Sequence, residues 1–110
     1  MSAEPPDTPI LDLLGRMTAD SVETSTLDEQ TLMLARVAAL VAVDAPPASY
    51  LLNLRAAGEV GVTSDQVTGV LAAIAPIVGT TRILAAAGRM AKALGVAEEL
   101  AELSEYADAG

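Results

Sequence analysis

The chain has 110 residues and a mass of 11.2 kDa, the size of one small domain. Apolar residues make up 52% of the sequence, but Phe and Trp are absent, so a core must rely on many Leu, Val, Ile and Ala contacts. Cys and His are also absent. Their absence excludes disulfides, thiol redox chemistry, proton transfer by imidazole and zinc sites of the usual kind.

The net charge of −9 is unevenly distributed along the chain. Seven acids and one base lie in residues 1–30, three acids and five bases in residues 31–95, and five acids and no base in residues 96–110. Six basic residues in all do not provide the basic face that nucleic acid binding requires. We expect the acidic ends to be solvated, and the alternative is an acidic tail that recruits a basic protein partner.

We expect neither an export signal nor a membrane span in this sequence. Met1–Pro9 is acidic and Pro-rich and contains no apolar stretch. The longest run without a charged residue, Gln66–Thr81, is shorter than the roughly 20 residues that a membrane span needs. We therefore expect a cytoplasmic protein that does not associate with membranes.

The first predicted helix follows a short N-terminal segment, residues 1–7, which is acidic and Pro-rich and which we expect to be disordered. Thr8 and Pro9 are typical of a helix start, because the hydroxyl can cap the first turn and proline is tolerated there. The amphipathic segment that follows is apolar at positions 10, 11, 13, 14 and 17. Residues 18–25 have the composition of a polar connector.

Thr26–Glu29 has the pattern of a capping box, with acids where the helix dipole favours them. It predicts a helix that extends to about Val43 and is apolar at every position from Val37 onward. Asp44–Pro47 interrupts this helix. Another helix is expected from Pro46 and Pro47 to Gly61.

The capping-box spacing recurs at Thr63 and Gln66 and predicts a helix to about Ala75. Pro76 and Gly79 are expected to kink or end this helix.

Thr80 or Thr81 can cap a further helix, which Gly95 would close in the usual C-terminal position. A last, acidic helix is expected over residues 97–107, followed by a tail at 108–110.

These elements together predict an all-α fold, because no segment has the alternation of a strand. We expect a single helical domain over residues 8–107. Two of its helices, at 27–43 and 64–78, are apolar on nearly all sides, and one chain of this size cannot bury both. The surplus apolar surface predicts an obligate homo-oligomer.

Several sequence features follow one another in a characteristic order within residues 27–94. Leu27–Glu29 opens an Ala- and Val-rich helix, and prolines interrupt the chain before the next one. Arg55–Thr63 then leads through Asp65–Val67 into a third helix, and Val78–Arg82 precedes the final long helix. In these features the chain resembles the carboxymuconolactone decarboxylase / alkylhydroperoxidase D-like family, over about two thirds of its length.

The resemblance implies a small helical bundle of the alkylhydroperoxidase D-like type, assembled as a trimer or hexamer. Peroxidase-type members carry a Cys-x-x-Cys pair with a His four residues later, and the matching positions here are Pro46, Ser49 and Asn53. The supporting Glu matches Met33 or Leu34, so the Glu and His that decarboxylase-type members keep are missing too. Serine cannot form a sulfenic acid and asparagine cannot take up a proton at neutral pH. The resemblance is therefore to a member without its catalytic residues, a pseudoenzyme with no cofactor.

Ser49, Tyr50 and Asn53 are the candidate ligand-binding residues, because they lie where that family's active site would be. Ser49 and Asn53 are four residues apart and share one helix face. The alternative is that these polar side chains satisfy backbone groups.

Arg36 and Arg82 are candidates for binding a ligand carboxylate, because guanidinium groups bind carboxylates in a bidentate way. The alternative is that each pairs with an acid such as Asp28, Asp44 or Glu59. We expect no metal site, since the acids of the last helix lack the loop of spaced oxygens that calcium requires.

Three functions are compatible with these observations. The first is a non-catalytic homo-oligomer that acts in assembly, interaction or ligand binding. The second is a protein that binds or processes a small molecule, a lactone or a carboxylate, with Ser49, Tyr50, Asn53 and Arg36. The third is a module whose acidic tails recruit a basic protein.

Overall fold

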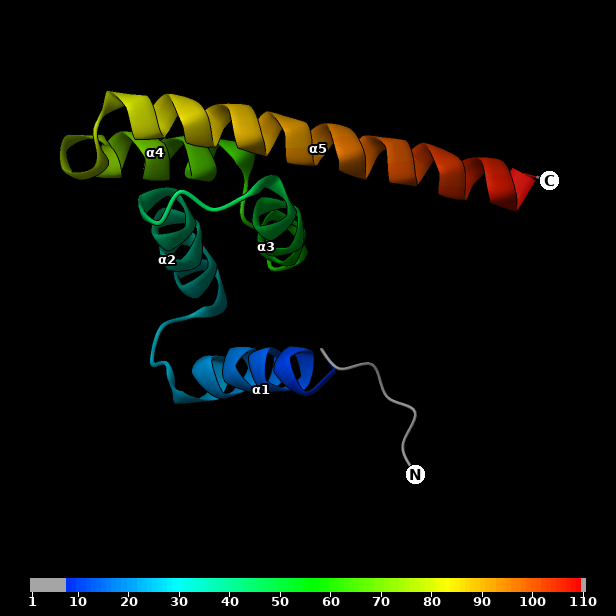
Figure 1. Cartoon of the computed structure of the whole chain (residues 1–110), viewed down its shortest axis with the longest axis horizontal. Helices are drawn as coiled ribbons and strands as arrows, with labels where there is room; N and C mark the ends of the chain where they lie inside the picture. Colours follow the sequence, from blue (N-terminus) through cyan, green and yellow to red (C-terminus); the bar gives the residue numbers. More distant parts are fainter. Residues whose placement is uncertain (1–7, 110) are drawn as a thin grey trace.

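The computed structural model describes the backbone of residues 8–109 and the side chains of residues 8–95. The described backbone forms five α-helices and contains no strand, which confirms the all-α prediction. The helices are α1 (Thr8–Thr24), α2 (Glu29–Ala42), α3 (Pro47–Glu59), α4 (Ser64–Val78) and α5 (Thr80–Ala109). In Figure 1, α2, α3, α4 and the first half of α5 form the body of the molecule, and α1 lies apart from it.

Asp28, and not Thr26, is the N-cap of α2, so the capping box predicted over Thr26–Glu29 is wrong. Its carboxylate accepts hydrogen bonds from the Thr31 backbone N–H at 2.8 Å and from the Thr31 hydroxyl at 2.9 Å. These bonds hold the pKa of Asp28 below its ordinary value, because they favour the charged form. The stabilisation they provide is present above the unfolded-state pKa and is lost as the pH falls through the lowered folded-state value.

The capping box predicted at the start of α4 is present. The Thr63 hydroxyl accepts from the Gln66 backbone N–H at 3.2 Å, and the Gln66 side chain accepts from the Thr63 backbone N–H at 2.9 Å. Two N–H groups that the helix cannot satisfy internally are thereby paired.

We expect Thr63→Ala to lower the free energy of unfolding by about 1 kcal/mol, the usual cost of a lost N-cap. Thr68→Ala is the matched control, because Thr68 is exposed inside the same helix and its replacement raises helix propensity slightly. Urea unfolding followed by circular dichroism measures both variants at one chain concentration. Equal effects of the two substitutions would show that the capping box adds nothing to stability.

The chain reverses between helices at residues with a positive φ. Asp44 has φ 59° between α2 and α3, Gly61 has φ 89° after α3, and Gly79 has φ 87° between α4 and α5. Gly79 ends α4 three residues after Pro76, which lies inside the helix. The predicted break at this point is therefore confirmed, and its position is set by the glycine.

Residues 18–24 are helical, so the polar connector predicted there is wrong. The Thr18 hydroxyl donates to the Leu14 carbonyl oxygen at 3.0 Å, and its hydrogen bond is thus made within α1. Polar composition without Gly or Pro does not end a helix.

The predicted end of a helix at Gly95 is also wrong, because α5 continues without a break from Thr80 to Ala109. One glycine inside a helix costs only about 1 kcal/mol, and no proline follows to enforce a stop. The helices expected over 80–94 and 97–107 are one helix, and it includes residues 108 and 109 of the expected tail. The expected disorder of residues 1–7 lies outside the described residues.

The core lies where α3 and α5 pack on α2, with α4 against α2 and α5. Its larger cluster includes the fully buried Tyr50 and two valines of α2, surrounded by small residues that let the helices approach closely: Val37, Val41, Ala45, Tyr50, Ala86, Met90 and Ala93. A smaller cluster joins α2 to the end of α3 through Leu32, Met33 and Ala57. No described side chain of α1 is buried. Within the described part of the chain, no helix has the length and apolar character that crossing a membrane requires.

Candidate functional site

Ser49 and Asn53 lie on one face of α3, as their spacing predicts, and both are half-buried. The Asn53 side-chain amide donates to the Ser49 carbonyl oxygen at 2.9 Å, and the Ser49 backbone N–H donates to the Pro46 carbonyl oxygen at 3.1 Å. The amide N–H of Asn53 is thus engaged with the backbone of its own helix. For Asn53 this arrangement matches the alternative, in which the side chain satisfies a backbone group; Ser49 takes part in these bonds through its backbone.

Tyr50, the third candidate on α3, lies in the core with no exposed surface. Its hydroxyl has no hydrogen-bond partner among the described residues. Burial raises the pKa of this phenol above its ordinary value, and of the nearby charges Arg89 lowers it and Asp44 raises it. The side chain is therefore neutral at physiological pH and acts as a packing element.

Arg36 and Arg82 each donate hydrogen bonds to residues of another helix. The Arg36 guanidinium donates to the Thr18 carbonyl oxygen at 3.3 Å and to the Ser21 hydroxyl at 3.1 Å, which links α2 to α1. The Arg82 guanidinium donates to the Ala42 carbonyl oxygen at 2.6 Å, at the last turn of α2. Within residues 8–95 neither guanidinium hydrogen-bonds to Ser49 or Asn53, and neither pairs with an acid.

Asp44 pairs instead with Arg89 of α5, a residue that sequence reasoning did not single out. Arg89 also donates to the Asp44 carbonyl oxygen at 3.4 Å. The pair joins the turn between α2 and α3 to α5, across 45 residues of sequence. Both side chains are partly exposed, so the pair fixes the position of the turn more than it adds stability. The sequence analysis named Asp44 as a possible partner of Arg36 or Arg82, and nothing in the sequence identifies Arg89 as its partner.

The positions that match the family's catalytic residues have no acid–base group. Met33 is buried in the smaller cluster and Leu34 is half-buried beside it on α2. Pro46 is the N-cap of α3 and Pro47 its first residue. The described residues also contain no group of three or more Asp or Glu side chains placed to hold a metal ion.

An apolar pocket of about 200 Å³ lies between α3, α4 and α5. None of the five candidate residues lines it, and its only polar lining residues come from the start of α4: Leu54, Ala57, Val62, Thr63, Ser64, Val67, Met90 and Leu94. A smaller pocket of about 140 Å³ shares Leu54 and Leu94 with it and adds Leu51, Arg55 and Ala93. Sequence reasoning missed both pockets, because they arise between helices that are distant in the sequence and have no local signal.

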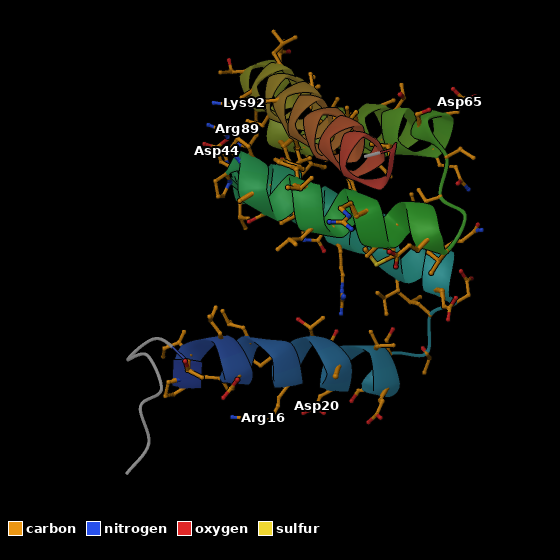
Figure 2. The ribbon with its side chains drawn as sticks, turned by 90° about the vertical axis from the view of Figure 1, so that its right-hand side faces the viewer. Arg16, Asp20, Asp44, Asp65, Arg89 and Lys92 are labelled. Atoms are coloured by element: carbon orange, nitrogen blue, oxygen red, sulfur yellow. The ribbon has the colours of Figure 1, made fainter. Side chains whose placement is uncertain are left out.

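Large apolar side chains remain exposed over much of the described surface. On α1 these are Ile10, Leu11, Leu13, Leu14, Met17 and Val22, each at least 45% exposed. Figure 2 shows Arg16 and Asp20 pointing away from α2–α5, and helical spacing places Leu11, Leu14 and Val22 on the opposite side of α1. On α3, α4 and α5 the most exposed are Leu52 at 67%, Ile77 at 86% and Leu84 at 67%. The structure therefore leaves apolar surface uncovered on several helices.

Comparison of the chain with protein-family models, with curated proteins and with solved structures gave no match.

Proposed function

We propose that the chain is a non-catalytic, homo-oligomeric helical protein of the carboxymuconolactone decarboxylase-like type, with a role in assembly or interaction. The observation that carries the proposal is the uncovered apolar surface of α1, on which four of the residues from Ile10 to Leu14 are large, apolar and at least 45% exposed. Apolar patches of this kind on a small protein mark interaction sites. A second copy of the chain is the simplest partner, since it brings the same apolar faces. A cytoplasmic location and a trimeric or hexameric assembly belong to the same proposal.

The chemistry of the described residues supports a non-catalytic role. The Asn53 side chain hydrogen-bonds to the Ser49 carbonyl oxygen within α3, and the Tyr50 side chain is fully buried. Proton transfer at neutral pH needs a group whose pKa lies near 7, and neither a serine hydroxyl nor an asparagine amide provides one. An enzyme whose site is built on Ser49 and Asn53 would need its acid–base group from another residue.

Sedimentation velocity tests the proposal on the apolar face of α1. We expect Leu11→Gln/Leu14→Gln to reduce the size of the assembly, because it removes apolar surface without removing a core residue. Asp12→Gln/Arg16→Gln is the matched control, since both residues are exposed on the same helix. A monomeric wild-type chain, or equal behaviour of the two variants, would contradict the proposal.

A second candidate function is binding of a small apolar molecule in the pocket between α3, α4 and α5. The lining is almost entirely apolar and holds no cation, which favours an uncharged ligand over a carboxylate. Native mass spectrometry of the purified protein should then show extra mass that Val67→Phe removes and Asn53→Leu retains. Loss of the extra mass in Asn53→Leu would instead support a lactone or carboxylate site built on Ser49, Asn53 and Arg36.

A further inference from the structure

Hydrogen bonds from Arg36 define which side of α1 faces the body of the molecule. The Arg36 guanidinium donates to the Thr18 carbonyl oxygen at 3.3 Å and to the Ser21 hydroxyl at 3.1 Å. In Figure 2, Arg16 and Asp20 point away from α2–α5, on the other side of α1. Each face of α1 can therefore be placed relative to the body.

One flank of α1 carries a stripe of large apolar side chains. Its members follow the i, i+3, i+4, i+7 spacing of one helix face, and each is at least 45% exposed: Ile10, Leu13, Leu14 and Met17. We call these four residues the α1 stripe.

The α1 stripe spans the flank between the side of α1 that faces the body and the side that faces away. Residues seven apart lie on nearly the same line of a helix. Leu14 precedes Ser21 by seven residues and so lies near the Arg36 contact, whereas Leu13 precedes Asp20 by seven and lies near the side that points away. Most of the α1 stripe is therefore open to a partner while α1 remains bonded to Arg36.

No other helix of the described chain covers the α1 stripe. Ile10 is 58% exposed and Met17 is 56% exposed, and no described side chain of α1 is buried. In Figure 1, α1 lies apart from the other helices. Isolated helices of about 12–15 residues are marginal in water even when they are rich in Ala, and most helical stability in proteins comes from packing of an apolar face. With 17 residues and an internal glycine, Gly15, α1 needs such packing to be stable.

A second copy of α1 fits this stripe in length and in charge. The next two positions of the pattern are polar, Asp20 and Ser21, so the α1 stripe is about 11 Å long. A second α1 offers an apolar stripe of the same length. The charged residues Asp12, Arg16 and Glu23 lie on the other half of the helix, so two stripes can meet without burying these charges.

The charge of α1 disfavours a membrane surface as the partner. Helices that lie on membranes carry Lys and Arg on their polar face, and these residues are attracted to anionic lipids. The polar face of α1 has three acids and one base: Asp12, Asp20, Glu23 and Arg16.

We propose that α1 packs against α1 of a second copy through the α1 stripe, and that α1 is stably helical only when this stripe is covered. The inference rests on the proposed homo-oligomer and specifies one of its contacts. Leu11 and Val22 lie on the side of α1 that faces the body and stay outside this contact. The hydrogen bonds of Arg36 are kept, so the contact requires no rearrangement of the body.

A scan of three consecutive cysteines tests which side of α1 meets the second copy. The full chain has no cysteine of its own. Leu11→Cys places a thiol on the side that faces the body, Asp12→Cys on the charged side and Leu13→Cys in the α1 stripe. Covalent dimers are quantified on non-reducing gels after mild oxidation. We expect the yield to be highest for Leu13→Cys and roughly tenfold lower for the other two variants.

The outcomes of the scan separate this inference from the function on which it rests. Equal yields for the three variants, or the highest yield for Leu11→Cys, would overturn the inference. An assembly in which Leu13→Cys forms no covalent dimer would also overturn it, and the homo-oligomer would stand. A monomeric wild-type chain would overturn both.

Hydrogen exchange of the α1 backbone amides tests the coupling between folding and assembly. We expect Ile10→Gln/Met17→Gln to speed exchange in α1 roughly tenfold and to leave the protected amides of α2 unchanged. Gln has a higher helix propensity than Ile and one similar to that of Met, so lost propensity would not explain the change. Asp12→Asn/Glu23→Gln is the matched control on the charged side and should keep the wild-type rates. Unchanged exchange in Ile10→Gln/Met17→Gln would contradict the coupling.

Discussion

Replacing Tyr50 by alanine is expected to lower the free energy of unfolding by about 3–5 kcal/mol. Among the described residues Tyr50 is the largest fully buried side chain, and it packs among Val37, Val41 and Met90 where α2, α3 and α5 meet. Its surroundings include small alanines that cannot fill the space an alanine at position 50 would leave. Domains of this size have only about 5–15 kcal/mol of stability, so the variant should be near its unfolding limit.

Tyr50→Phe is the matched control and should keep or slightly raise the stability. The hydroxyl that it removes is buried without a partner among the described residues, so its loss removes a desolvation cost and no hydrogen bond. Urea unfolding at one fixed chain concentration measures both variants, because oligomers have concentration-dependent stability. A loss above about 1 kcal/mol in Tyr50→Phe would show that the hydroxyl has a bonding partner after all.

Gly61→Val is the second substitution with a large expected effect, a loss of about 2–3 kcal/mol. Gly61 has φ 89°, a conformation that costs a β-branched residue about 1–2 kcal/mol. A Cβ at this position would lie 2.9 Å from Nε2 of Gln30, whose side chain donates to the Val60 carbonyl oxygen at 3.0 Å. The substitution therefore strains the turn after α3 and disturbs the hydrogen bond that holds it to α2.

Gly58→Ala should have the opposite effect, a gain of about 0.5–1 kcal/mol. Gly58 lies three residues before Gly61, inside α3, and a Cβ there meets no atom within 4 Å. Thermal unfolding of the two variants in one buffer gives the comparison. If both substitutions destabilise equally, the backbone conformation of Gly61 is not the cause.

Local sequence signals were sufficient to predict where most of the helices begin and end. The capping box of Thr63 and Gln66, the proline junction before α3 and the break at Gly79 each act within a few residues, and each is present in the structure. The errors arose where a weak signal for the end of a helix was outweighed by the helix propensity of the neighbouring residues. Gly95 lies inside a long helix whose neighbours favour helix, and residues 18–24 are polar but contain no helix breaker.

The candidate site was harder to predict, because long-range contacts determine it. The spacing of Ser49 and Asn53 correctly placed both on one face of α3, but it could not indicate that the Asn53 amide bonds to the helix backbone. The guanidinium groups of Arg36 and Arg82 bind partners 18 and 40 residues away, and no periodic pattern encodes such pairs.

Self-association is the central claim, and the mass of the intact assembly in native mass spectrometry tests it most directly. The purified full chain, with no ligand added, is expected to give discrete oligomers. Trimers or hexamers without extra mass would support the account. A monomer at micromolar concentration would contradict the account, because the exposed apolar faces of α1, α3, α4 and α5 would then have no copy of the chain to cover them.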